Sequence, residues 1–305
     1  KGNYADMRTD GWEASLSWRD SHKVAGKTLS YNIKVAVWDN TSKITRYTAK
    51  TGTLPTNYAI NYYEGMTLGE MWGYKCDGLF QSDEEAQTWA NYSKFTNRSA
   101  TWQAGDPRYL DLNGDGYVNN GNNTIYDHGD LVKIGNTTPR YSYSIQGGVR
   151  WNGIGISMMW QGVGKRDWYP AKESGYFWGQ YGRPYSMALP WHNSDRWSPT
   201  NRGAYWPRLV GYSASDSGLI LAQPNTRYVQ DASYIRLKNL TIDYNFPKEL
   251  VNKIGLQALK IYVSGENLLT FSPLKKYAKN YDPEGIYAGY ADYGTNKFGS
   301  DNFGD

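Results

Sequence analysis

The sequence predicts an all-β fold, an antiparallel transmembrane β-barrel with long loops, and three observations lead to this prediction. Apolar and polar residues alternate along several stretches, as they do in strands with one apolar and one polar face. Short turns and very long connections follow one another along the chain. The 305 residues have a mean hydropathy of -0.72 although 16% of them are aromatic, so the aromatic residues do more than fill one apolar core.

Three strand hairpins are expected, over about 11–39, 141–163 and 233–271. The second contains Asn152-Gly153 between two alternating runs, which is the strongest short-range signal for a β-hairpin. In the third, the alternation changes register near Lys238-Asn239, and this predicts a β-bulge. We therefore expect paired antiparallel strands in each of these regions.

The connections between the hairpins cover about 40–140, 164–231 and 272–305 and are mostly irregular in pattern. Ser82 followed by Glu85 is a capping-box pattern and predicts one short helix of two or three turns. Because short turns and long connections alternate strictly, all short turns should lie at one end of the sheet and all long loops at the other. Outer-membrane barrels have this arrangement, with the long loops outside the cell. Residues 1–305 are thus expected to form part of one β-barrel domain.

Composition excludes several classes of protein. Lys and Arg number 33 against 29 Asp and Glu, and this small excess is spread along the chain, which gives no support to nucleic acid binding. The single Cys76 excludes an internal disulfide framework. No apolar run approaches the roughly 20 residues that a membrane-spanning helix needs. The 13 Trp and 28 Tyr against 7 Phe favour rings with a polar group, which suit sugar-binding, partner-binding or membrane interfaces.

An acidic, glycine-punctuated run begins at Asp111 and resembles the start of a calcium loop of the EF-hand type. Calcium needs six to eight oxygen ligands, and position 12 of this loop is Asn122 rather than an acidic residue. Asp127 or Asp130 would have to supply the missing carboxylate. Asn-Gly and Asp-Gly are also ordinary turn residues, so a turn without metal is the alternative. The other candidate oxygens belong to Asp111, Asn113, Asp115, Tyr117 (backbone carbonyl) and Asn119.

Aromatic residues are concentrated in the second long connection. They could form a surface that stacks on sugars or binds a partner, or they could pack the loop against itself. The histidines, His22, His128 and His192, are expected at the surface, and no catalytic motif accompanies them, so an enzyme is not expected. The candidate substrate or partner surface comprises Trp168, Trp178, Trp191, Trp197 and Trp206.

The chain resembles the C-terminal barrel portion of SusC/RagA-type TonB-dependent outer-membrane transporters of Bacteroidetes. Four stretches carry the resemblance, in the order of the family. They are ADMRTDGWEASLSWRD (5–20), GEMWGYKCDGLFQSDEEA (69–86), YLDLNGDG with KIGNTTPRYSYSIQGGVRWNGIGISMMWQGVG (109–116 and 133–164), and SYIRLKNLTIDYNFPKELVNKIGLQALKIYVSGENLLTF with YDPE (233–271 and 281–284).

The resemblance implies a large plugged barrel in the cell outer membrane, of about 22 strands. It implies a SusD-like surface lipoprotein as partner, energy from TonB, contact with outer-membrane lipid, and import of glycans or peptides. The family's signal sequence, TonB box, plug and closing strand are missing from the sequence, so we expect the rest of the barrel and the plug as further partners. Residues 119–128 look inserted relative to the family's loop, and Asp130 then takes the place of its last acidic residue.

A secreted β-rich glycan-binding module with a structural calcium site is the alternative. The two hypotheses differ in where the apolar residues of the strands point. A barrel wall turns them outward in one band, whereas a soluble module gathers them in a shared core. The residues that decide between the two are Trp12, Leu16, Val35, Ile145, Ile156 and Ile242.

Overall fold

The computed structural model describes residues 4–55, 61–89, 102–172, 174–186, 188–215 and 219–286. The expected loop over 272–305 therefore lies partly outside the described residues. No helix within these ranges is long and apolar enough to cross a membrane.

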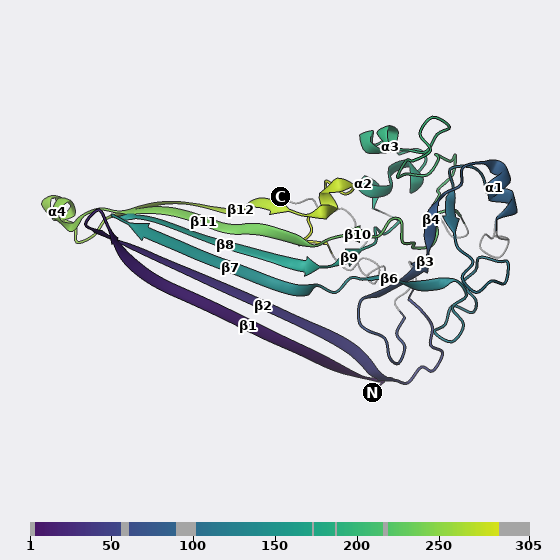
Figure 1. Cartoon of the computed structure of the whole chain (residues 1–305), viewed down its shortest axis with the longest axis horizontal. Helices are drawn as coiled ribbons and strands as arrows, with labels where there is room; N and C mark the ends of the chain where they lie inside the picture. The colour runs from purple at the N-terminus through teal and green to yellow at the C-terminus, as the bar shows by residue number, and fades with distance from the viewer. Residues whose placement is uncertain are drawn as a thin grey trace.

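A six-stranded antiparallel sheet dominates the fold (Figure 1). Its strand order is β1-β2-β7-β8-β11-β12, so each strand pairs with its neighbours along the chain once the loop strands are set aside, and β1 and β12 form the two edges. The strands are β1 (Ala5–Val24), β2 (Lys27–Tyr47), β7 (Arg140–Trp151), β8 (Ile154–Lys165), β11 (Tyr234–Asn245) and β12 (Lys260–Phe271).

The three short connections of this sheet lie at one end, and the long loops lie at the other (Figure 1). Ala25-Gly26 joins β1 to β2, and Asn152-Gly153 joins β7 to β8. Both residues of each turn have positive φ, 50° and 75° in the first and 47° and 86° in the second. Two-residue turns with positive φ match the twist of the flanking strands. Gly adopts positive φ without strain, and it is the second residue of both turns. The third connection, from β11 to β12, holds α4 (Lys248–Val251) and a 3-10 turn, η2 (Asn252–Ile254).

The predicted bulge in β11 is present, as a register shift between Leu237 and Asn239 in the pairing with both neighbouring strands. Leu237 pairs with Trp160 and Leu240 pairs with Met158. Since Trp160 and Met158 are two residues apart on β8, they point to the same face of the sheet. The bulge thus returns the apolar residues of β11 to one face.

The long connections fold into a compact unit at the loop end of the sheet, which we call the loop module (described residues of 48–139, 166–233 and 272–286). Three small two-stranded sheets lie within it, β3 with β6, β4 with β5, and β9 with β10. Its elements are β3 (Glu70–Tyr74), β4 (Cys76–Leu79), α1 (Asp83–Thr88), β5 (Pro107–Tyr109), β6 (Leu131–Asn136), β9 (Asp167–Trp168), α2 (Gly175–Trp178), η1 (Gly179–Tyr181), α3 (Pro190–Ser194), β10 (Gln230–Asp231) and η3 (Pro273–Lys276).

The expected start of the first long connection at about residue 40 needs correction. β2 continues to Tyr47, where it pairs with Ala5 at the start of β1. This extension has no apolar face, so it carries no alternation that a sequence pattern could reveal. The helix at Ser82 forms as predicted but is shorter, six residues, with the Ser82 hydroxyl accepting the Glu85 N–H at 3.1 Å. The Glu85 carboxylate reaches back to the backbone before the helix and accepts the N–H of Gln81 at 2.6 Å.

Candidate functional site

One face of the six-stranded sheet is apolar and uncovered. Leu16 pairs with Val35, and Val35 pairs with Ile145, so these side chains share a face across three strands. Ile156 pairs with Ile242 on the same face. Leu16 is 76% exposed and Ile242 is 49% exposed. Neighbouring strands therefore present a continuous apolar surface to the surroundings.

The buried core of the protein lies elsewhere, in the loop module. Among the described residues, Ile44 at the loop end of β2 is the only fully buried core member from the six-stranded sheet. The residues chosen to distinguish the two hypotheses do not gather in that core, and Trp12 is 53% exposed. The sheet therefore does not pack as the soluble module requires.

Aromatic residues bound the apolar face at both ends. On β7, Trp151 lies beside the Asn152-Gly153 turn, and Tyr143 lies eight residues earlier toward the loop module. The Tyr143 ring packs over Gly162, the residue paired with it, and its hydroxyl donates to the Tyr234 carbonyl at 3.3 Å. At about 3.3 Å per residue, Tyr143 and Trp151 are roughly 26 Å apart along the strand.

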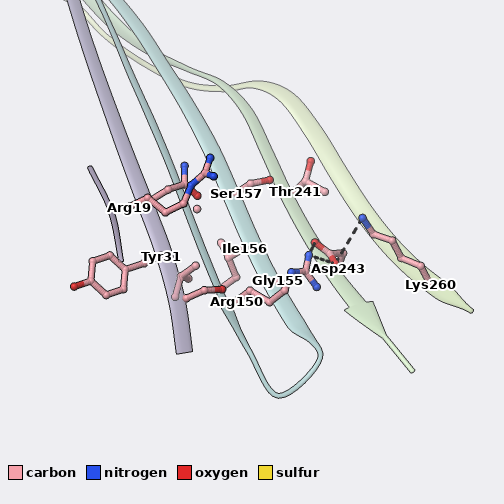
Figure 2. A pocket seen from close by; sticks show the side chains of 13 residues that line it. Arg19, Tyr31, Arg150, Gly155, Ile156, Ser157, Thr241, Asp243 and Lys260 are labelled. Atoms are coloured by element: carbon pink, nitrogen blue, oxygen red, sulfur yellow. Dashed lines mark hydrogen bonds and ion pairs between the residues drawn. The ribbon is translucent and has the colours of Figure 1, made fainter. Parts of the chain in front are cut away.

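The opposite face is polar, and near the short turns it has a hollow of about 400 Å³ (Figure 2). Arg150 of β7 reaches across β8 to Asp243 of β11, with Nη2 at 2.7 and 3.0 Å from the two carboxylate oxygens. The residue between them on β8 is Gly155, and a Cβ there would clash with the Arg150 guanidinium. Lys260 of β12 lies 3.6 Å from Asp243 and Arg19 of β1 lines the hollow. Two cations, Arg150 and Lys260, thus lie within 4 Å of the Asp243 carboxylate.

A second ionic cluster lies toward the loop end of the polar face. Arg236 of β11 donates to Asp282 and, at 2.6 Å, to Glu284, both in the YDPE run. Lys238 adds two contacts of 3.0 Å to Glu284. Burial raises the pKa of Asp282, but the Arg236 hydrogen bond and a backbone N–H outweigh it, so the pKa lies below its usual range. The segment 272–286 is held on the polar face by these charges.

The acidic run at Asp111 forms a loop closed by its own hydrogen bonds. The two carboxylate oxygens of Asp111 accept the N–H groups of Gly114 and Gly116 at 2.7 and 2.8 Å. Both glycines have positive φ, 76° and 82°, which turns the backbone around the carboxylate. Asp115 accepts the Tyr117 N–H at 2.8 Å. The oxygens expected to bind calcium therefore already accept backbone hydrogens.

Asp130 joins this loop from outside the run and is fully buried. One of its oxygens accepts the Leu112 N–H at 2.7 Å and the other accepts the Asn119 N–H at 2.8 Å. Within the described ranges, no group of three or more His, Cys, Asp or Glu side chains could hold a metal ion. An ion would have to share oxygens that already accept hydrogen bonds, so the calcium site stays a prediction.

The candidate tryptophan surface needs correction for three of its five members. Trp168, Trp178 and Trp206 are 5%, 1% and 0% exposed and belong to the core of the loop module. Their rings pack against other aromatic rings, as Trp206 does with Tyr181 at a centroid distance of 5.9 Å. Buried rings cannot stack on a sugar or contact a partner. Only the half-buried Trp191 and Trp197 retain exposed area.

His192 is also buried, contrary to the expectation of a surface histidine, with 2% exposure. Its Nε2 lies 2.7 Å from the Phe177 carbonyl and therefore carries the hydrogen, while Nδ1 has no hydrogen-bond partner. Burial lowers the pKa of His192 to about 4, against the opposing effect of the bond to Phe177. His192 is thus a neutral ring that helps to pack the loop module.

The sequence is similar to several TonB-dependent receptors of Formosa agariphila. TonB-dependent receptor P3 is 29% identical over 226 residues, 73% of this chain and 19% of the relative. TonB-dependent receptor P26 is 27% identical over 198 residues, 64% of this chain and 17% of the relative. The chain is homologous to part of a TonB-dependent receptor. No protein-family model matches it.

Solved structures agree with this relationship at the level of the fold. The structure of the RagAB peptide transporter matches 92% of this chain and 27% of that chain, with a TM-score of 0.62 and 19% identity. The 'open-open' state of the RagAB peptide importer matches with a TM-score of 0.61 and 18% identity. The predicted resemblance to a partial SusC/RagA-type receptor and the antiparallel fold are confirmed. The proteins it resembles are receptors and transporters, not enzymes.

The aligned region spans about a fifth of the length of the curated relatives.

Sequence reasoning missed the pairing of Arg150 with Asp243 and that of Arg140 with Asp39, the latter held by two hydrogen bonds of 2.6 Å. The partners are 93 and 101 positions apart, so no local pattern connects them. A glycine opposite an arginine in a polar strand face, as at Gly155, is the one sequence signal that could have indicated such a contact.

Proposed function

We propose that this chain forms a section of the barrel wall and outer loops of a TonB-dependent importer in the outer membrane. The observation that carries the proposal is the uncovered apolar face of the six-stranded sheet. Monomeric soluble proteins rarely expose a large continuous apolar surface. In lipid, exposing such an apolar surface carries no free-energy penalty, and the paired strands satisfy one another's backbone hydrogen-bonding groups.

The dimensions of the apolar face support a membrane environment. Outer-membrane barrels carry an apolar band about 25 Å tall, with aromatic residues at both interfaces. Tyr143 and Trp151 bound a comparable length of β7, and tilting of the strands would shorten it somewhat. The polar face would then line the barrel interior, and the loop module would lie outside the cell.

The substrate and partner belong to the same proposal. Glycans or peptides are the proposed cargo, with a SusD-like surface lipoprotein over the loop module and TonB acting through the remainder of the receptor. The similarity in fold to the RagAB peptide transporter supports this assignment of cargo and partner. Copurification of the full-length receptor with such a lipoprotein, and growth of cells with and without the receptor on peptides or glycans, test the partner and the cargo.

A pair of arginine substitutions tests the membrane assignment. In the full-length receptor, Ile242→Arg places a charge on the apolar face, and Thr241→Arg places the same charge on the polar face of the same strand. Arg on the lipid face costs about 2–4 kcal/mol at the middle of the bilayer and less toward either interface, whereas a position facing the interior tolerates it. Ile242→Arg should lower the urea midpoint and the amount of folded receptor in outer membranes far more than Thr241→Arg. Equal effects would contradict the proposal.

A further inference from the structure

The connection between β11 and β12 exposes several large apolar side chains beyond the end of the sheet. It is the longest of the three short connections and lies at the tip of the sheet (Figure 1). Leu250 is 55% exposed, Ile254 is 65% exposed and Leu256 is 46% exposed. Val251 is the buried residue of the helical turn. The other three apolar side chains lie largely at the surface of the described part of the chain.

A connection between two strands does not require such residues. The other two short turns use two residues each, Ala25-Gly26 and Asn152-Gly153. Polar residues would serve equally well in a turn that faces water. An exposed cluster of aliphatic side chains instead indicates a surface that contacts something apolar.

The turn continues the apolar face of the sheet. Tyr244 at the end of β11 pairs with Ile261 at the start of β12, and both belong to the apolar face. The Tyr244 ring contacts Phe246, two residues before the first residue of α4, with centroids 4.8 Å apart. Apolar side chains thus follow one another from the sheet into the turn.

The charges of the turn favour an anionic surface. Lys248 and Lys253 lie within the two helical turns, and Glu249 is their only acidic residue. Lysine stems pack along apolar surface while the ammonium reaches polar groups. Aliphatic residues with interspersed lysines are the composition of segments that lie in the membrane interface, where anionic headgroups attract the lysines.

We propose that the β11–β12 turn rests on the inner surface of the bilayer, with Leu250, Ile254 and Leu256 at the boundary between headgroups and acyl chains. Lys248 and Lys253 contact phospholipid headgroups there. This inference rests on the proposed function, because the adjoining face must already lie in lipid. It adds a contact beyond the barrel wall that fixes the depth of the barrel in the membrane.

Site-directed fluorescence in vesicles tests the inference. The full-length receptor, with Cys76 and any cysteine outside this chain replaced by Ser, receives a single environment-sensitive dye at Ile254→Cys. It is reconstituted in vesicles of phosphatidylethanolamine and phosphatidylglycerol. The vesicles also contain a spin-labelled lipid, whose label lies either close to the headgroup or near the end of the acyl chain. The dye should lose fluorescence to the label close to the headgroup, and less to the deep label.

Matched positions separate this inference from the proposed function. A dye at Leu16→Cys, on the apolar face, should be quenched by the deep label, and a dye at Thr241→Cys, on the polar face, by neither. Quenching of the Ile254 dye by aqueous iodide alone would overturn the inference, and so would protection from both lipid labels and iodide, which indicates a protein partner. If the Leu16 dye escapes every lipid label, the proposed function itself fails.

Discussion

Asn119 and Asp130 are joined by two hydrogen bonds that run in opposite directions. The Asp130 N–H donates to the Asn119 carbonyl at 2.8 Å, and the Asn119 N–H donates to the Asp130 carboxylate at 2.8 Å. The second carboxylate oxygen accepts the Leu112 N–H at 2.7 Å. One buried side chain thereby holds both ends of the acidic loop.

Replacing Asp130 by Asn should open this loop. An amide has one acceptor oxygen, so its NH2 group would face one of the backbone N–H donors. Hydrogen bonds to a charged acceptor are worth about 1.5–3 kcal/mol each, and we expect a local loss of about 2 kcal/mol or more. Amide hydrogen exchange over residues 111–119 of the full-length receptor measures it. Asp231→Asn, at an exposed carboxylate that accepts one backbone bond from Ser233, is the control and should leave the exchange unchanged.

Calcium binding by the same loop is a separate prediction. If an ion is bound, Asp111→Ala together with Asp115→Ala removes two of its negative ligands, and calcium measured by mass spectrometry in the purified receptor should disappear. Treatment of the unaltered receptor with a chelator should then increase cleavage of the loop by protease. Equal metal content in both proteins, with unchanged protease resistance, would favour the turn without metal.

Gly155→Ala should disturb the ion pair on the polar face. The added methyl group would clash with the Arg150 guanidinium and lie 2.5 Å from an oxygen of Asp243, so the pair must separate. Overpacking of this kind costs about 1–3 kcal/mol. Gly147→Ala is the matched control, because a Cβ there meets neighbours at an ordinary 3.9 Å. Urea unfolding of the full-length receptor should rank Gly155→Ala as the less stable variant, and equal midpoints would argue against a tight contact.

The sequence revealed those parts of the fold that depend on local pattern. In half-exposed strands, apolar and polar residues alternate along the sequence, so the turn at Asn152-Gly153 and the bulge after Leu237 could be predicted. The burial of Trp206 could not, because aromatic residues are as common on binding surfaces as in cores. What buries it is a set of distant rings, including Tyr228 stacked on it at 5.8 Å. The calcium ligands could be named from spacing, but only the structure gives the hydrogen bonds with which an ion would compete.

The loop module should lose stability on mild acidification because of His192. Its Nδ1 is buried without a hydrogen-bond partner, so protonation there would place an unpaired charge in the core. The folded pKa is lowered to about 4 from an ordinary 6.5, so the unfolded chain binds the proton more readily between these values. Stability from the neutral ring is complete above pH 6.5 and is lost as the pH falls toward 4, by on the order of 3 kcal/mol.

Hydrogen exchange of residues 175–206 at pH 7.5 and pH 5, corrected for the intrinsic effect of pH, measures this loss. His192→Gln retains an N–H that can reach the Phe177 carbonyl but does not titrate, so the difference between the two pH values should shrink. His22→Gln removes an exposed histidine far from the loop module and should leave the difference intact. If His192→Gln preserves the full pH dependence, another group is responsible and the buried neutral ring is not the source.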